Sequence, residues 1–92
     1  NLFMDAYVNL SNIYYNMDKT EKALDFMKKA ISLDPEKRIL YVNLSNIYDK
    51  AGKHREAVFY KRVGTGSLIF KSKKEHGSYI IDKVKINETT QN

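Results

Sequence analysis

The spacing of apolar residues along the first part of the chain predicts α-helices. Four residues at intervals of three and four share one side of a helix: Tyr7, Leu10, Tyr14 and Met17. A second set with the same spacing follows: Ala23, Leu24, Met27, Ala30 and Ile31. This second helix is expected to stop at Asp34, because Pro35 disfavours helical geometry in the residue before it. The pattern therefore predicts an antiparallel helical hairpin over residues 4–37.

The same pattern returns 34 residues later. Residues 7–14 and 41–48 both read Tyr-Val-Asn-Leu-Ser-Asn-Ile-Tyr, so the chain contains an internal repeat. Gly52 supplies the next turn, and the following helix is expected to end at Gly64 and Gly66. Four residues lie along that helix: Arg55, Ala57, Val58 and Val63. The repeated pattern therefore predicts a second helical hairpin over residues 38–66.

The turn inside the first hairpin carries polar residues that favour the start of a helix. The side chain of Asp18 or Thr20 can accept hydrogen bonds from the free N–H groups of the second helix, and Glu21 is favourable in its first turn. We expect one of these two residues to cap that helix.

These positions resemble the tetratricopeptide repeat family, whose 34-residue unit has an aromatic residue, a leucine, a small residue and a tyrosine in its first helix. Alanine, an aromatic residue, alanine and proline follow. The first repeat agrees at Tyr7, Leu10, Ser11, Tyr14, Ala23, Ala30 and Pro35, with Met27 in the aromatic position. The second agrees at Tyr41, Leu44, Ser45, Tyr48, Gly52 and Ala57. The resemblance implies an all-α fold, in which antiparallel helix hairpins stack as a short right-handed solenoid.

The second repeat departs from the family pattern in its last helix. Lys61 occupies the aromatic position and Gly64 that of the second alanine. We expect a short or displaced helix in which Tyr60 takes over packing. The tyrosines of the repeated octamer are predicted to pack inside, whereas Tyr15 and Tyr60 are the better candidates for exposed contact residues.

In stacked hairpins of this family, the first helices line a concave groove. The residues predicted to face it are Val8, Asn9, Asn12, Tyr15 and Asn16 in the first repeat, and Val42, Asn43, Asn46 and Lys50 in the second. The side-chain amide of asparagine can both donate and accept hydrogen bonds. It therefore suits the alternating N–H and C=O groups of an extended peptide backbone. We hypothesise a protein-interaction scaffold whose groove binds an extended peptide or a helix of a partner protein. The alternative is that these asparagines are simply solvated.

Residues 67–92 leave the repeat pattern and form a basic C-terminal cap and tail. Two stretches rich in β-branched and aromatic residues flank residues 73–77, which is typical of a β-hairpin. Four residues nevertheless have helical spacing: Ile80, Lys83, Val84 and Asn87. Because repeat arrays usually end with a helix that covers the last apolar face, we expect a capping helix over residues 78–88, with the β-hairpin as the alternative.

The net charge of +5 comes entirely from the C-terminal part. Residues 1–52 hold seven basic and seven acidic residues, whereas residues 53–92 hold nine and four. The basic tail residues are Lys71, Lys73, Lys74, Lys83 and Lys85. They could bind an acidic partner or a phosphate backbone, but a solvated lysine face is the commoner explanation. A protein partner is therefore favoured over nucleic acid.

Residues 33–81 also resemble the C-terminal extension motifs of plant organellar pentatricopeptide proteins, which are tetratricopeptide-like and work in RNA editing. The matching stretches are residues 33–36, 41–48, 51–52 and 73–80, with an insertion near residues 64–70. This resemblance implies an alternative function as an RNA-associated module of an organellar editing factor.

Other classes of protein are disfavoured. The chain has no cysteine for a disulfide or a zinc-cysteine site. His54 and His76 have no partners that form a catalytic or metal-binding motif, so we predict no enzymatic activity, no metal and no cofactor. No apolar run reaches the length of a membrane span, and we expect a cytoplasmic protein. The chain starts within an apolar pattern, which suggests a piece of a longer array. A stable stack usually needs about three repeats, so pairing with a second copy as a homodimer is a further expectation.

Overall fold

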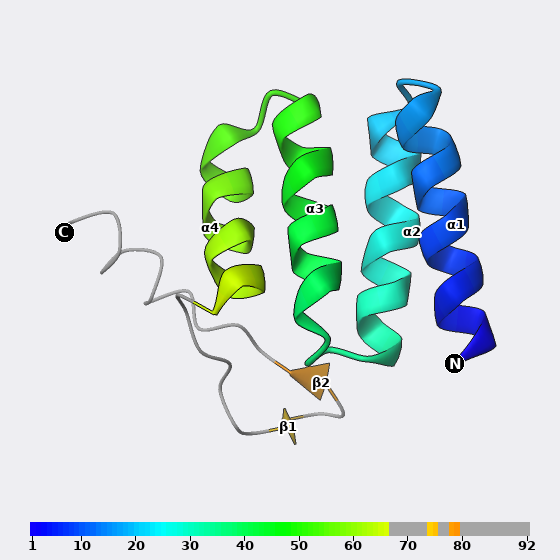
Figure 1. Cartoon of the computed structure of the whole chain (residues 1–92), viewed down its shortest axis with the longest axis vertical. Helices are drawn as coiled ribbons and strands as arrows, with labels where there is room; N and C mark the ends of the chain where they lie inside the picture. The colour runs from blue at the N-terminus through cyan, green and yellow to red at the C-terminus, as the bar shows by residue number, and fades with distance from the viewer. Residues whose placement is uncertain (67–73, 76–77, 80–92) are drawn as a thin grey trace, which may run out of the picture.

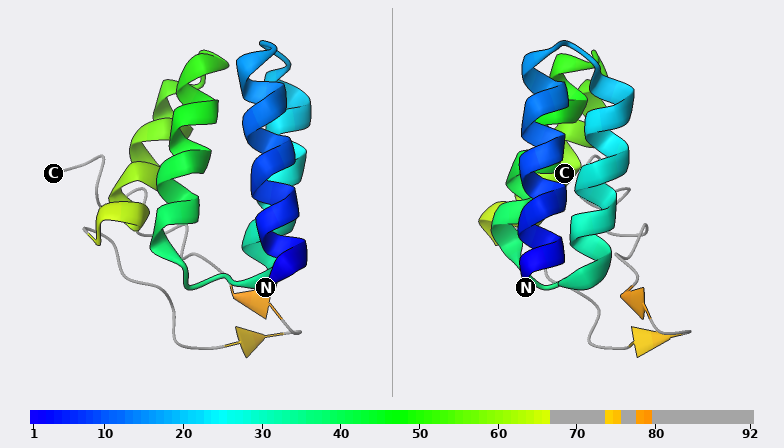
Figure 2. Two further views of the ribbon diagram at one scale, coloured as in Figure 1. Left: turned by 45° about the vertical axis from the view of Figure 1, so that its right-hand side comes forward. Right: turned by 90° about the vertical axis from the view of Figure 1, so that its right-hand side faces the viewer.

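The computed structural model describes residues 1–66, 74–75 and 78–79 of the chain. Residues 1–66 form four helices, α1 (Leu2–Asn16), α2 (Thr20–Leu33), α3 (Arg38–Lys50) and α4 (His54–Thr65). They lie side by side in chain order, and each runs antiparallel to the one before it (Figure 1). Further views show the same pairing of α1 with α2 and of α3 with α4 (Figure 2). The predicted all-α fold of stacked helix hairpins is confirmed.

Small residues allow the helices of a hairpin to approach closely. Ser11 on α1 is fully buried, and its hydroxyl donates a hydrogen bond of 2.7 Å to the carbonyl oxygen of Ala23 on α2. Ala23, Met27 and Ala30 are also fully buried. The apolar stripe predicted for the second helix therefore forms the centre of the core.

Each repeat contains the same stack of three aromatic rings. In the first, Tyr7 and Tyr14 both stack on Phe26, with ring centroids 6.1 and 5.6 Å apart. In the second, Tyr41 and Tyr48 stack on Tyr60 at 6.2 and 5.5 Å. The packing role predicted for Tyr60 is confirmed. Its predicted role as an exposed contact residue is wrong, because the ring is held between two others.

The two identical octamers differ in burial. Leu44 and Ile47 on α3 are each 2% exposed, whereas their counterparts on α1, Leu10 and Ile13, are 37% and 53% exposed. The reason is their neighbours: α3 lies between α2 and α4, while α1 lies at one end of the stack of described helices (Figure 1). Tyr7, Leu10, Tyr14 and Met17 were expected to share the packed side of the first helix. That expectation is wrong for Leu10, and Met17 is likewise 52% exposed.

The first turn differs from the expected one. Lys19 precedes α2 and makes no side-chain capping hydrogen bond. Asp18 has a left-handed backbone with φ of 62°, and its carboxylate pairs with the ammonium of Lys50 on α3 at 2.9 Å. The predicted capping by Asp18 or Thr20 is therefore wrong, because Asp18 is used to join the two repeats.

The last helix is shortened, as expected, and ends at a glycine. It has 12 residues against 14 in α2, and Gly66 follows it with φ of 89°. Gly64 lies inside α4 instead of ending it. A methyl group in place of its hydrogen would lie 2.5 Å from Cγ2 of Val42 and 2.8 Å from the Val42 amide nitrogen. Glycine at this position thus lets α4 approach the backbone of α3.

In the C-terminal part the structure describes two short strands, β1 (Lys74–Glu75) and β2 (Ser78–Tyr79). They pair antiparallel, with Lys74 opposite Tyr79 and Glu75 opposite Ser78. Residues 78 and 79 are thus in a strand where the capping helix was expected to begin, in agreement with the β-hairpin alternative. The remainder of the expected cap, residues 80–88, lies outside the described residues, as do Lys71, Lys73, Lys83 and Lys85.

Candidate functional site

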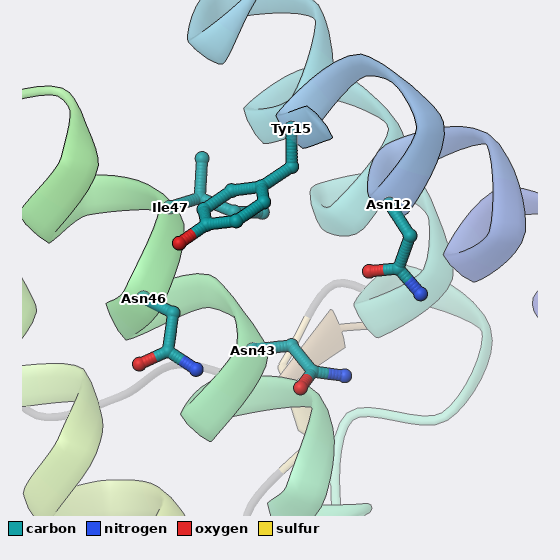
Figure 3. Close-up of a pocket in the computed structure, with 5 residues that line it drawn as sticks. All are labelled: Asn12, Tyr15, Asn43, Asn46 and Ile47. Carbon is teal, nitrogen blue, oxygen red and sulfur yellow. The ribbon is translucent and has the colours of Figure 1, made fainter. Parts of the chain in front are cut away.

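A pocket of about 100 Å³ lies between the first helices of the two repeats. Its lining comprises Asn12 and Tyr15 from α1 and Asn43, Asn46 and Ile47 from α3 (Figure 3). The helical rise places Asn12 and Tyr15 one turn apart, and likewise Asn43 and Asn46, so each helix presents two neighbouring side chains to the same opening. Both repeats are therefore needed to form the pocket.

The two copies of the repeated octamer contribute different residues to the lining of the pocket. Asn12 and Asn46 are equivalent residues, 34 positions apart, and both line it. Ile47, which follows Asn46, is 2% exposed and gives the pocket an apolar wall. Its counterpart Ile13 does not line the pocket, because it lies on the outer side of α1. The stacking of the repeats thus gives the two copies of one sequence different roles.

Lys50 fixes the position of Tyr15. Its ammonium nitrogen donates a hydrogen bond of 2.7 Å to the carbonyl oxygen of Tyr15 and lies 4.1 Å from the centre of the Tyr15 ring. The same nitrogen pairs with Asp18. A cation above an aromatic ring is attracted to it, and the pairing with Asp18 balances the charge. Lys50 therefore holds the end of α1 against α3 and orients one wall of the pocket.

The nine residues predicted to face the groove have three kinds of position. Four of them line the pocket: Asn12, Tyr15, Asn43 and Asn46. Lys50 lies beside it and contacts Tyr15. The other four are outside its lining: Asn9 and Asn16 are exposed, Val8 is half-buried against the core, and Val42 is half-buried beside Gly64.

Ile47 lines the pocket but was not among the residues predicted to face the groove. The signal was available, since Ile47 lies three residues after Leu44 and so belongs to a second apolar row of the same helix. Ile47 is a buried core residue and also forms a wall of the pocket, so the side of the helix opposite the tyrosines does not include the whole lining.

The side chains that line the pocket are suited to binding a ligand and not to catalysis. Its lining offers three amides, one phenol and one aliphatic side chain, which can exchange hydrogen bonds and pack but include no strong acid, base or nucleophile. In the part of the chain that the structure describes, no cluster of three or more His, Cys, Asp or Glu residues could hold a metal ion. His54 is exposed and its Nδ1 lies 2.6 Å from a carboxylate oxygen of Asp49, away from the pocket lining.

Within residues 1–66, 74–75 and 78–79, none of the helices has the length and apolar character required to cross a bilayer. A search of curated proteins found no match. The family model described as "Tetratricopeptide repeat" matches residues 5–37 and 40–60, which is more than half of the chain. With its 34-residue period and its stacked helix hairpins, the chain belongs to the tetratricopeptide repeat family.

Proposed function

We propose that this chain is a protein-interaction scaffold and that the pocket between α1 and α3 binds an extended segment of a partner protein. Tetratricopeptide repeats generally mediate protein–protein interactions and typically act as scaffolds without enzymatic activity. The observation that carries the proposal is the gathering of Asn12, Asn43 and Asn46 from two repeats around one opening (Figure 3).

The amides favour an extended segment over a helix as the occupant. In a helix the backbone N–H and C=O groups are already paired with each other, whereas an extended segment presents them unpaired. Each asparagine can donate to a carbonyl oxygen and accept from an N–H group. Three amides side by side therefore match the alternating groups of an extended backbone.

The apolar part of the lining gives the pocket its selectivity. Ile47 and the ring of Tyr15 form apolar walls, and a volume of about 100 Å³ holds one side chain rather than a folded element. Because Lys50 fixes Tyr15 before any ligand arrives, little side-chain freedom is lost at this wall on binding. The pocket is thus suited to a single aliphatic side chain flanked by backbone groups.

The charge distribution separates this function from RNA binding. The five lining residues carry no formal charge, so peptide binding should depend only weakly on salt. Binding of RNA, the function implied by the pentatricopeptide resemblance, would require contacts to phosphates and would weaken steeply as salt rises.

A peptide display library provides the test, because it samples many candidate partner sequences at once. Peptides selected on the wild-type chain are measured by fluorescence anisotropy against Asn12→Ala and Asn46→Ala, with Asn9→Ala and Asn16→Ala as matched asparagine controls outside the pocket. Loss of one neutral hydrogen bond should weaken binding by about two- to tenfold, and the controls should bind as the wild type does. The proposal is abandoned if selection yields no peptide, if the controls lose as much affinity as the pocket variants, or if only single-stranded RNA binds and does so with steep salt dependence.

A further inference from the structure

One large apolar residue lies exposed on the side of α3 that faces the pocket. At about 100° per residue, Ile39 points in a direction between those of Asn43 and Asn46, one turn nearer to the start of the helix. Asn43 and Asn46 line the pocket, and Ile39 is 53% exposed. The row of residues that forms the α3 wall of the pocket therefore continues by one turn and becomes apolar there.

The facing helix carries a carboxylate at the corresponding position. Helices α1 and α3 run parallel, side by side (Figure 2), and together they line the pocket. Asp5 on α1 is the equivalent of Ile39, 34 positions earlier, and it is exposed. It also points within about 20° of the direction of Asn12. Beside the pocket there is thus an aliphatic residue on one helix and an acidic residue on the other, and both lie between the two repeats.

The charge of Asp5 is available to a ligand. None of the ion pairs found among the described residues includes it. The cations of α3 are engaged elsewhere: the ammonium of Lys50 pairs with a carboxylate at 2.9 Å, and the guanidinium of Arg38 donates to a backbone carbonyl oxygen of α4 at 2.8 Å. Lys37, which precedes α3, follows Glu36 of opposite charge. The surface around Asp5 should therefore attract a basic group.

The distance from the pocket to Ile39 fits two residues of an extended segment. Ile39 precedes Asn43 by four residues, which is about 6 Å along the helix axis. In an extended segment, alternate side chains point the same way and are about 6.6 Å apart. A segment that inserts one side chain into the pocket should therefore place another, two residues away, beside Ile39.

A basic side chain satisfies both residues of this surface. The methylene stem of lysine or arginine can pack on Ile39 while its charged end reaches Asp5 on the facing helix. An acidic side chain would be repelled by Asp5, and an aliphatic one would leave the charge unused. One exposed ion pair adds only weakly to the salt dependence of binding.

We propose that Asp5 and Ile39 form an adjacent subsite, which selects a lysine or arginine two positions from the aliphatic residue that enters the pocket. This inference rests on the proposed function, because it extends the same binding site. It specifies the partner as an extended segment with an aliphatic and a basic residue in alternate positions.

Peptide selection on charge variants tests the adjacent subsite. The display library is applied to the wild type, to Asp5→Lys and to Asp25→Lys. Asp25 is exposed on the side of α2 opposite Ala23 and Met27, so its variant carries the same change in net charge away from the site. The wild type and Asp25→Lys should both enrich lysine or arginine two positions from the aliphatic residue, whereas Asp5→Lys should enrich aspartate or glutamate there. The same preference in all three, or a reversal in Asp25→Lys as well, would overturn the proposal.

Fluorescence anisotropy measures the size of each contribution. Peptides selected on the wild type should bind Asp5→Lys about three- to tenfold more weakly, and Asp25→Lys without loss. Ile39→Ser should weaken binding by about two- to fivefold and keep the preference for a basic residue. Leu33→Ser, at an exposed position on α2, is the control and should bind as the wild type does. Equal losses in the variants and their controls would contradict the subsite, and Asp5→Asn, which should abolish the preference, replaces Asp5→Lys if that variant unfolds.

The same measurements separate this inference from the proposed function. If the selected peptides lose affinity on Asn12→Ala and Asn46→Ala but carry no basic residue at the stated position, binding in the pocket stands and the adjacent subsite is overturned. If selection on the wild type yields no peptide, both proposals fail.

Discussion

Phe26 and Tyr60, which are 34 residues apart, make the same contact in the two repeats: each ring stacks between two tyrosines of the preceding helix. Both lie one residue before the position at which the family has its aromatic residue. Met27 and Lys61 occupy that position instead. The shift keeps an aromatic ring inside each hairpin and lets Lys61 face solvent.

The stacked rings of Tyr48 and Tyr60 should contribute to the free energy of unfolding in a coupled manner. Tyr48 and Tyr60 have ring centroids 5.5 Å apart and planes within 10° of parallel. A double-mutant cycle with Tyr48→Leu and Tyr60→Leu, measured by urea unfolding, should give a coupling of about 0.5–1.5 kcal/mol. The control is a cycle of Tyr60→Leu with Tyr7→Leu, because these tyrosines belong to different stacks. Equal coupling in the two cycles would rule out a specific ring contact.

Leu44 should contribute far more to stability than an exposed leucine does. Leu44 is 2% exposed and Leu33 is 43% exposed. Leu44→Ala leaves a cavity between α2 and α3 and should lower the free energy of unfolding by about 2–5 kcal/mol. Leu33→Ala should cost less than about 1 kcal/mol. Chemical denaturation of both variants checks the difference, and similar losses would contradict the assigned burial.

Gly64→Ala should destabilise the chain, although alanine favours a helix over glycine by about 1 kcal/mol. The added methyl group would lie 2.5 Å from Cγ2 of Val42 and 3.0 Å from the carbonyl oxygen of Arg38. Separating α4 from α3 to relieve this contact should cost about 1–3 kcal/mol.

The double variant Gly64→Ala with Val42→Ala provides the control for this contact. Thermal unfolding should show only partial recovery, because the backbone atoms of α3 remain too close to the new methyl group. A gain in stability from Gly64→Ala alone would show that the helices are not in such close contact.

Tyr41 should make the stability of the fold sensitive to alkaline pH. Burial, together with neighbouring Tyr60, Asp34 and Glu36, raises the pKa of Tyr41 to about 12, against about 10 in the unfolded chain. Because folding favours the neutral phenol, its contribution is fully present below pH of about 10 and is lost as pH rises toward about 12.

The comparison variant for this pH dependence is Tyr41→Phe, which lacks both the ionisation and the 2.6 Å hydrogen bond to the carbonyl oxygen of Pro35. Urea unfolding should show the wild type as the more stable at neutral pH, by about 1 kcal/mol. The difference should shrink between pH of about 10 and about 12. A constant difference over this range would mean that Tyr41 ionises as freely in the fold as in the unfolded chain.

Local spacing carried most of the information about the fold. Three- and four-residue intervals predicted the helices, and the identical octamers at an offset of 34 predicted their arrangement as two hairpins. These features depend on residues that are close in sequence, so they can be derived from the sequence alone. The turn at Asp18 could not, because its backbone is fixed together with an ion pair to Lys50, 32 positions away.

Burial and the pocket depend on how elements pack, and there the sequence predicted less. Leu10 and Leu44 have the same neighbours in sequence, yet only Leu44 has a helix on its other side. Val42 was assigned to the groove by its position on the helix, but the close approach of α4 at Gly64 places it beside that contact. Asn12, Tyr15, Asn43 and Asn46 line the pocket, and helix geometry alone predicts that each pair shares one side of its helix.

The unequal burial of the twin octamers gives identical residues different tolerances to substitution. A polar replacement at Leu44 would place a polar group in the core, while the same replacement at Leu10 would leave that group partly in water. Positions 10 and 13 should therefore accept polar residues that positions 44 and 47 do not.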